Sequence, residues 1–124
     1  MSLVIGSSSK MRHEILREMG VSAFSVLSPD IDERAIRHSD PSIMVQLIAA
    51  AKLAKCEQML LQTPPNAASA PVVVLCADQV IVCGGVVREK PRDAAECAAF
   101  LRSYAAGEAA ECICTCRALT SQCK

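Results

Sequence analysis

The chain begins with a short apolar strand that runs through a hydroxyl-rich turn into a basic helix start. This βα unit constrains the fold more than any other segment. The residues Leu3–Ile5 predict the strand, and a helix is expected over about Ser9–Met19, ended by Gly20. The start of such a helix offers unpaired backbone N–H groups, and its dipole favours anions. With Lys10 and Arg12 beside them, the serines of the turn form a candidate phosphate cradle.

Strand and helix patterns alternate along the rest of the chain, which is typical of an α/β fold. The predicted strands are Val21–Leu27, Val72–Cys76, Glu108–Arg117 and the two arms of a hairpin, Val80–Cys83 and Val86–Val87, joined by Gly84-Gly85. Two further helices are expected over about Pro41–Leu61 and Asp93–Tyr104.

Both predicted helices begin with recognisable caps. Asp40 before Pro41 is a strong helix start, and Asp93 with Glu96 three residues later forms a capping box. The helix from Pro41 is expected to bury a face made of Met44, Leu47, Ile48 and Ala51.

Composition limits what the chain can do. Its 124 residues predict a single domain, residues 1–124, and 52% hydrophobic content is enough for a real core. The formal net charge is zero, with 13 basic and 13 acidic residues, which argues against nucleic acid or a membrane as partner. No apolar run approaches the roughly 18 residues of a membrane span, and no secretory signal is visible. We therefore expect a cytoplasmic protein.

Eight cysteines are many for this length. They include no C-x-x-C pair, and with only two histidines a zinc site has little support. Cys112, Cys114 and Cys116 alternate, so a strand would place them on one face. We interpret the cysteines as small buried hydrophobes in a reducing compartment, with a metal or redox role as the alternative.

Four isolated polar residues are the candidates for chemistry. Glu33 and Lys52 lie in an acidic loop and an Ala-rich helix, Asp78 follows the apolar strand that ends at Cys76, and Lys90 follows the hairpin. Each alone is typical of a structural role, although Asp78 must find a partner if its strand is buried. As a set they offer two carboxylates for a divalent cation and two cations for phosphates. That inventory suits a nucleoside triphosphate hydrolase.

Five segments, in order, resemble the motifs of the Maf-like nucleoside triphosphate pyrophosphatases. The family patterns are A-S-x-S-P-x-R, D-x-D/E-E, L-A-x-x-K-A, G-A/S-D-T/Q-V and G-x-x-x-x-K-P. The matching segments here are Gly6–Arg12, Asp30–Glu33, Ile48–Leu53, Cys76–Val80 and Gly85–Pro91.

The resemblance implies a fold like that of the inosine triphosphate pyrophosphatases, with a mixed sheet flanked by helices and a cleft between two lobes. It implies metal-dependent hydrolysis of a nucleoside triphosphate to the monophosphate and pyrophosphate, with Mg²⁺ or Mn²⁺ as cofactor. Glu33 and Asp78 would hold the metal, and Asp78 would also orient or deprotonate the attacking water. The remaining implied roles are phosphate binding by Ser7, Ser9 and Arg12, charge neutralisation by Lys52 and Lys90, and a substrate contact by Gln79.

The chain also departs from the family pattern. Lys10 and Met11 stand where members usually have Pro and Arg, and members usually extend well beyond residue 124, so we expect an incomplete second lobe. Met11 and Gln79 favour the branch that prefers 7-methyl-GTP over the branch that prefers dTTP and UTP. The alternative function is a truncated module that binds a nucleotide or protein without turnover. The expected partner is a nucleoside triphosphate, with a homodimer left open.

Overall fold

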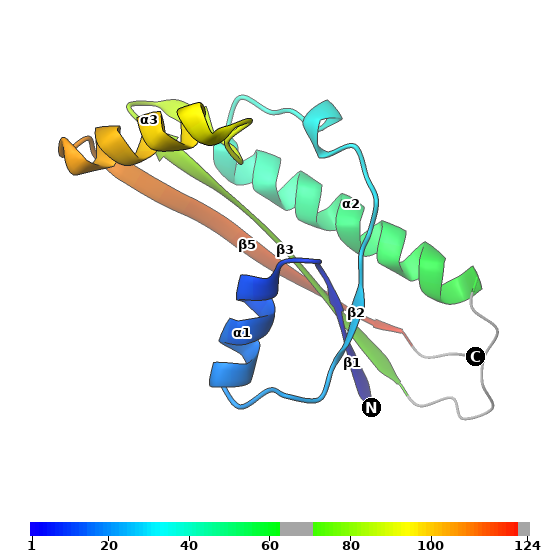
Figure 1. The fold of residues 1–124 in the computed structure, drawn as a ribbon. Helices are drawn as coiled ribbons and strands as arrows, with labels where there is room; N and C mark the ends of the chain where they lie inside the picture. The colour runs from blue at the N-terminus through cyan, green and yellow to red at the C-terminus, as the bar shows by residue number, and fades with distance from the viewer. Residues whose placement is uncertain (63–70, 122–124) are drawn as a thin grey trace.

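The computed structural model describes residues 1–62 and 71–121, which form a five-stranded mixed sheet flanked by helices (Figure 1). The elements, in chain order, are β1 (Ser2–Gly6), α1 (Lys10–Glu18), β2 (Ser25–Leu27), the 3₁₀ turn η1 (Glu33–Ala35), α2 (Pro41–Gln62), β3 (Val72–Cys83), β4 (Val86–Arg88), α3 (Ala94–Ala105) and β5 (Ala110–Ser121). The predicted mixed α/β class is confirmed.

Strand β3 is the centre of the sheet. On one side, the first residues of β3 pair in parallel with β1, and its last residues pair antiparallel with β4. Strand β1 pairs in turn with β2, so the path of paired strands is β2-β1-β3-β4. On its other side β3 pairs antiparallel with β5 over its full 12 residues, from Val72 opposite Ser121 to Cys83 opposite Ala110. This long ladder fixes every side chain of β3 on a defined face of the sheet.

Helix α2 covers one face of β3 and β5, and alternate residues of β3 are buried beneath it. Two hydrophobic clusters form the core between α2 and the sheet. The buried members of the first are Val4, Cys56, Val74 and Cys76, and those of the second are Met44, Val45, Ile48 and Val80. The predicted inward face of α2 is correct at Met44 and Ile48 but wrong at Leu47, which is 44% exposed, and at Ala51. The buried stripe instead passes through Val45, Ala49, Lys52 and Cys56.

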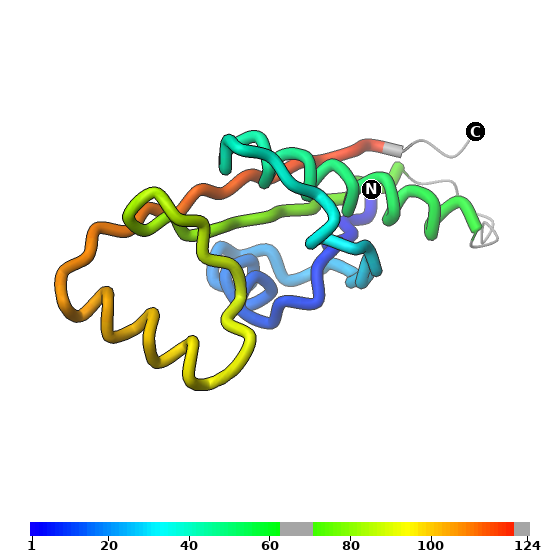
Figure 2. The backbone as a smooth tube through the Cα atoms, turned by 90° about the horizontal axis from the view of Figure 1, so that it is seen from above, coloured from blue at the N-terminus to red at the C-terminus, as the bar shows by residue number. Residues whose placement is uncertain are grey.

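Helix α3 lies at the far end of the molecule from β1 and buries none of its residues (Figures 1 and 2). Its predicted cap is confirmed, since Asp93 Oδ1 accepts a hydrogen bond from the backbone N–H of Glu96 at 2.8 Å. The capping box is altered, because the Glu96 carboxylate accepts from the N–H of Arg92, one residue before the cap. The Gly84-Gly85 turn is confirmed, and both residues adopt the positive φ that a two-residue hairpin of this kind requires.

Three sequence predictions were wrong in extent. The segments Val72–Cys76 and Val80–Cys83 form one strand, because the ladder to β5 continues through the residues between them. The predicted strand over Val21–Leu27 is reduced to its last three residues, which are the ones opposite the end of β1. The predicted strand over Glu108–Arg117 instead spans Ala110–Ser121, because it pairs with β3 along its full length.

The seven described cysteines fall into three classes of burial, and Cys97 on α3 is the one of intermediate burial. Cys56, Cys76 and Cys83 are buried, as predicted. The prediction was wrong for the three alternating cysteines of β5, namely Cys112, Cys114 and Cys116, which are exposed because α2 covers only the other face of that strand. Within the described residues all seven cysteines are free thiols, and no group of three or more His, Cys, Asp or Glu side chains is placed to hold a metal ion. No helix within residues 1–62 and 71–121 is long and apolar enough to cross a bilayer.

Candidate active site

Asp78 lies in the middle of β3 and not at a strand end, which corrects the sequence prediction. The sheet nevertheless places the end of a neighbouring strand next to Asp78. Strand β1 pairs with β3 only as far as Leu75, and β4 begins to pair only at Ile81. Asp78 therefore stands level with a gap between two neighbouring strands, just beyond the carboxyl end of β1. Such a gap at the end of parallel strands is where open α/β sheets place ligands.

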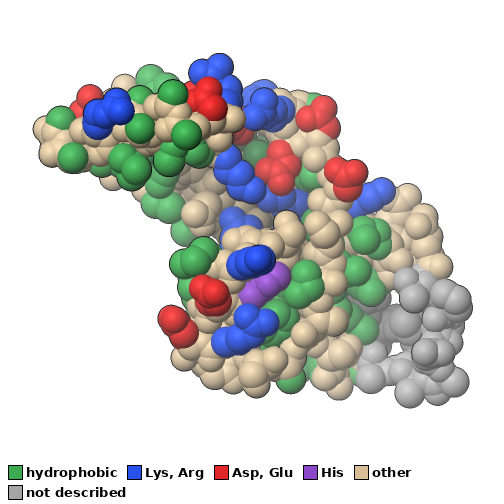
Figure 3. Space-filling view, in the orientation of Figure 1, with side chains coloured by type: hydrophobic (Ala, Val, Ile, Leu, Met, Phe, Trp, Pro, Cys, Tyr) green, Lys and Arg blue, Asp and Glu red, His purple; other side chains and the backbone are tan. Residues whose placement is uncertain are grey.

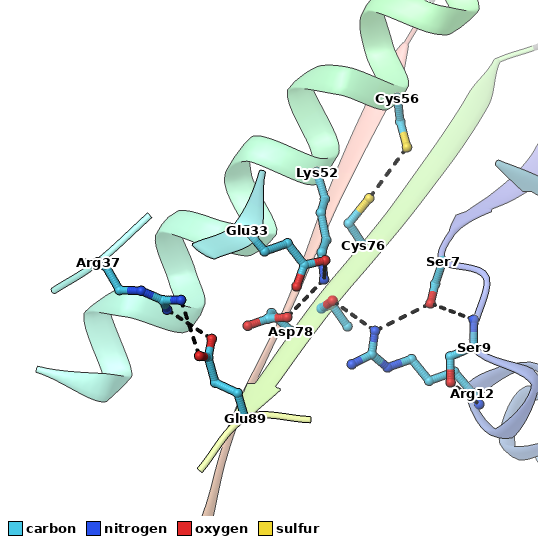
Figure 4. Close-up of polar contacts among 11 residues, drawn as sticks. Ser7, Ser9, Arg12, Glu33, Arg37, Lys52, Cys56, Cys76, Asp78 and Glu89 are labelled. Carbon is cyan, nitrogen blue, oxygen red and sulfur yellow. Dashed lines mark hydrogen bonds and ion pairs between the residues drawn. The ribbon is translucent and has the colours of Figure 1, made fainter. Parts of the chain in front are cut away.

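The side chain of Asp78 meets Lys52, which in turn reaches Glu33 (Figure 4). Lys52, from the buried face of α2, donates to Asp78 Oδ1 at 2.9 Å, and its Nζ also lies 3.0 Å from Oε1 of Glu33 on η1. Lys52 and Asp78 are only 8% and 6% exposed. Leaving either charge without its partner would cost about 3–5 kcal/mol. The structure thus unites Glu33, Lys52 and Asp78, three of the predicted site residues.

A second predicted group surrounds the start of α1. Ser9 is the cap of this helix, and its side chain accepts from the N–H of Arg12 at 3.5 Å. Ser7 Oγ accepts from the N–H of Ser9 at 3.2 Å and from Arg12 Nη1 at 3.4 Å. Arg12 Nη1 also donates to the carbonyl of Ala77 at 3.0 Å, which fixes the guanidinium beside the residue that precedes Asp78. The two hydroxyls therefore order the turn and hold Arg12 next to the gap.

Gln79 faces the opposite side of the sheet from Asp78, because neighbouring strand residues point to opposite faces. It lines a cavity of about 320 Å³ between α1 and the sheet. The lining is mainly apolar and includes Ile15, Leu16 and Cys114, but Ser7 and Arg12 also reach it. This cavity connects the predicted phosphate cradle with Gln79.

Among the described residues, Lys90 forms no hydrogen bond or ion pair with Asp78 or Lys52, and it lies in a separate basic cavity of about 340 Å³. This cavity, which we call the basic cavity, also contains the cations Arg34, Arg37, Arg88 and Arg92. Figure 3 shows Lys and Arg side chains gathered along the hollow between the α3 end and the α1 end of the molecule. Lys90 therefore lies near, but does not join, the group formed by Glu33, Lys52 and Asp78.

Sequence reasoning missed several residues around the site. His13 Nε2 lies 2.7 Å from the carbonyl oxygen of Ser7, and Arg37 forms a double hydrogen bond with Glu89 at 2.9 and 3.2 Å. The Arg37–Glu89 pair ties the segment after η1 to the loop that carries Lys90 (Figure 4). The two residues are 52 positions apart, so no local pattern could have paired them. In the sequence, the only indication that Arg34 and Arg37 lie near the site was their position shortly after Glu33.

The buried thiols pack directly behind the site. Cys56 Sγ on α2 and Cys76 Sγ on β3 are 3.9 Å apart. Burial raises the pKa of Cys56, and burial together with repulsion from Cys56 raises the pKa of Cys76 to about 12. Both groups are therefore neutral thiols at physiological pH and behave as core side chains.

The fold and site together define an α/β protein that presents two converging carboxylates and several cations at one gap in its sheet. Comparison with known proteins then identifies the family. The family model described as Maf-like protein matches residues 2–124, and the chain belongs to this family.

The relatives carry names with two different substrate preferences. The chain is 42% identical over 102 residues to the 7-methyl-GTP pyrophosphatase of Dictyostelium discoideum, an alignment that covers 82% of this chain and 51% of that protein. It is 39% identical over 101 residues to the dTTP/UTP pyrophosphatase of Cereibacter sphaeroides, covering 82% of this chain and 47% of that protein. A nucleoside triphosphate pyrophosphatase of Helicobacter pylori is 29% identical over 121 residues. The chain spans about half the length of the curated relatives it matches.

Proposed function

We propose that this chain serves as a nucleoside triphosphate pyrophosphatase, which hydrolyses its substrate to the monophosphate and pyrophosphate with the help of a divalent cation. The observation that carries the proposal is the convergence of Glu33 and Asp78 on Lys52 Nζ, at 3.0 and 2.9 Å. Arg12 and the start of α1 lie directly beside them. Relatives in the same family are named as pyrophosphatases.

The donor atoms suit a hard cation such as Mg²⁺ or Mn²⁺. Glu33 and Asp78 present carboxylate oxygens toward one point, Lys52 Nζ, and this arrangement supports a cation shared by the two carboxylates. Mg²⁺ is commonly held by one or two carboxylates together with substrate phosphates and water. When bound, the cation would offset charge on the phosphates and polarise the bond to be broken.

The chain's own residues supply positioning and proton transfer. Asp78 accepts a proton from the attacking water as the water oxygen bonds to the α-phosphorus and the bond to the departing pyrophosphate breaks. Lys52 and Lys90 offset the charge that develops on the phosphoryl oxygens. Ser7, Ser9 and Arg12, with the free N–H groups at the start of α1, hold the phosphates in place.

Asp78→Asn tests this mechanism. Asn is nearly isosteric but is a poor base and a weak ligand for a hard cation, so pyrophosphate release should fall by at least about 100-fold. Circular dichroism should show that the variant is folded. The matched control is Asp93→Asn, at the cap of α3, which should leave turnover unchanged because Asn caps helices as well as Asp does. Near wild-type turnover in Asp78→Asn would refute the assignment.

We further propose that 7-methyl-GTP is preferred over dTTP and UTP. The support is Gln79, which lines the mainly apolar cavity beside Arg12 and Ser7 and could contact a base there. Both substrate names occur among the relatives. A panel of these triphosphates, assayed by pyrophosphate release with Mg²⁺ or Mn²⁺, tests the preference. Gln79→Thr should shift the ratio of kcat/KM toward dTTP, and an unchanged ratio would contradict a role for Gln79.

A nucleotide-binding module without turnover is the second candidate. The observation that favours it is the Lys52 ammonium, which already pairs with both proposed metal ligands. The two candidates differ in a simple assay. A chain that binds nucleoside triphosphate by calorimetry but releases no pyrophosphate with either metal is a binding module.

A further inference from the structure

Strand β5 is an edge of the sheet along its whole length. It pairs with β3 over 12 residues, from Ala110 to Ser121, and within residues 1–62 and 71–121 no strand pairs with its outer side. An edge strand presents a row of backbone N–H and C=O groups that can pair with another chain. Proteins commonly protect such edges by keeping them short or charged, whereas β5 is long and carries only two charged side chains.

The two charges of β5 have opposite signs and are placed symmetrically along the strand. Glu111 and Arg117 lie three residues on either side of Cys114, so their side chains share one face. Both residues are exposed, and neither forms an ion pair or a side-chain hydrogen bond with any residue that the structure describes. A strand with this spacing of charges is complementary to an antiparallel copy of itself.

An antiparallel pair of β5 strands centred on Cys114 satisfies both charges. In this register Glu111 of each copy stands opposite Arg117 of the other, and opposite charges directly across two strands are stabilising. A two-fold dimer keeps the same face of both strands on the same side, so its register can change only in steps of two residues. One such step in either direction would place Glu111 opposite Leu119 or Thr115 and break both ion pairs. The charges therefore select the register centred on Cys114.

The same register aligns the three exposed cysteines of β5, which lie on the other face of the strand from the two charges. Cys114 stands opposite its own copy, and Cys112 stands opposite Cys116 of the second copy. Directly opposite residues of antiparallel strands have Cα atoms about 4.5 or 5.5 Å apart, and a disulfide spans about 4.4–6.8 Å. The thiols can therefore report the register.

We propose that β5 is a homodimer interface, in which two copies of this chain pair antiparallel about Cys114 and join their sheets into one. The partner is a second copy because the edge complements itself: the two charges on β5 neutralise each other across the two-fold axis. The chain has zero formal net charge, so its copies do not repel each other strongly as they approach. The interface is independent of the proposed function, since it concerns the outer edge of the sheet and not the gap at Asp78.

Sedimentation equilibrium under reducing conditions tests the interface. The wild-type chain should form a dimer, and Glu111→Arg should raise its dissociation constant at least about tenfold, because arginine then faces arginine at two positions. Arg117→Glu should have the same effect, since glutamate then faces glutamate. The double variant Glu111→Arg/Arg117→Glu restores opposite charges and should dimerise within about threefold of the wild type. The matched control is Glu18→Arg, the same change of charge on the exposed last residue of α1, which should leave dimerisation unchanged.

Disulfide trapping with diamide tests the register. Each disulfide forms as two thiols lose two protons and two electrons, which reduce diamide to the hydrazine. The background carries Cys97→Ser and Cys123→Ser, so that β5 holds the exposed thiols under test. A chain that keeps Cys114 alone on β5 should crosslink, and so should a chain that keeps both Cys112 and Cys116. A chain that keeps only one of those two should crosslink at least about tenfold more slowly, because its thiol then faces serine.

The outcomes decide between this interface and others. A wild-type chain that stays monomeric up to about 100 µM would overturn the inference, and so would a dimer that neither single charge variant weakens. Failure of the double variant to recover dimerisation would show that the two charges do not face each other. Equal crosslinking by all three single-cysteine chains would exclude the register centred on Cys114. Recovery in the double variant, together with selective crosslinking through Cys114, would establish the interface whether or not the chain hydrolyses a nucleotide.

Discussion

Gly6→Ala should destabilise the protein although it adds only one methyl group. Gly6 ends β1 directly in front of the two buried thiols, where a Cβ atom would lie 2.7 Å from Cys56 Sγ and closer still to Cys76 Sγ. Non-bonded contacts are optimal at about 3.5–4.0 Å. The thiols are 0% and 1% exposed, so neither sulfur can swing into solvent to make room. Glycine is present here because of this close approach.

The expected cost is about 2–3 kcal/mol of unfolding free energy, toward the upper end of the range for overpacked cores, because two sulfurs must move. Urea denaturation followed by circular dichroism measures it. Cys76→Ala removes the closer sulfur, so the double variant Gly6→Ala/Cys76→Ala should recover at least about 1 kcal/mol relative to the sum of the single variants. The family motifs have the larger and smaller residues the other way round. They have Ala at the position of Gly6 and Gly at the position of Cys76, which agrees with the idea that the two positions share one volume.

The single variant Cys76→Ala completes the cycle and reports the cost of the cavity alone. The reasoning is refuted if Gly6→Ala lies within about 0.5 kcal/mol of the wild type, or if the two substitutions add within that margin. Either result would mean that the thiols are not held against Gly6.

Four other predictions follow from the structure. Lys52→Ala should lower the unfolding free energy by about 3 kcal/mol, because it leaves a buried carboxylate unpaired. Lys90→Ala should leave stability within about 0.5 kcal/mol and lower kcat more than it raises KM, so equal losses of stability in urea melts would contradict the distinction. Burial raises the pKa of Cys76 from 9.0 to about 12, so the folded state favours the neutral thiol. This thiol should therefore leave the free energy of unfolding independent of pH below pH 9 and make it fall as the pH rises toward 12, by at most about 1.4 kcal/mol per pH unit. Cys76→Ala should remove that slope. Finally, the three exposed cysteines of β5 should crosslink copies of the chain in air; a band at twice the mass on a non-reducing gel should vanish with reductant or with all three changed to Ser, and its persistence would exclude these thiols.

Local signals in the sequence were sufficient for the parts of the structure that depend on a few neighbouring residues. Ser9 and Asp93 cap helices because their side chains reach N–H groups three residues on. The Gly84-Gly85 turn follows from the positive φ that both residues can adopt. The strand and helix order, and hence the mixed α/β class, followed from hydrophobic periodicity together with these signals.

The candidate site was partly visible for the same reason. Lys52 and Asp78 stood out as charged residues in apolar surroundings, whereas Glu33 was one of several acids in a loop, and the resemblance to the family motifs grouped the three as a set. Their convergence was not visible. The 26 residues between Lys52 and Asp78 say nothing about the 2.9 Å contact that joins them.

Which surfaces are covered, and which distant groups meet, depends on how the elements pack together. The continuity of β3 through Asp78 depends on its pairing with β5, and the exposure of the β5 cysteines depends on which face α2 covers. The contacts of Arg37 with Glu89, and of Gly6 with two thiols, join residues from separate elements. The local elements and the set of candidate functional residues can be read from the sequence, because these depend on neighbours along the chain. Register and packing brought that set to one gap in the sheet, because they depend on neighbours in space.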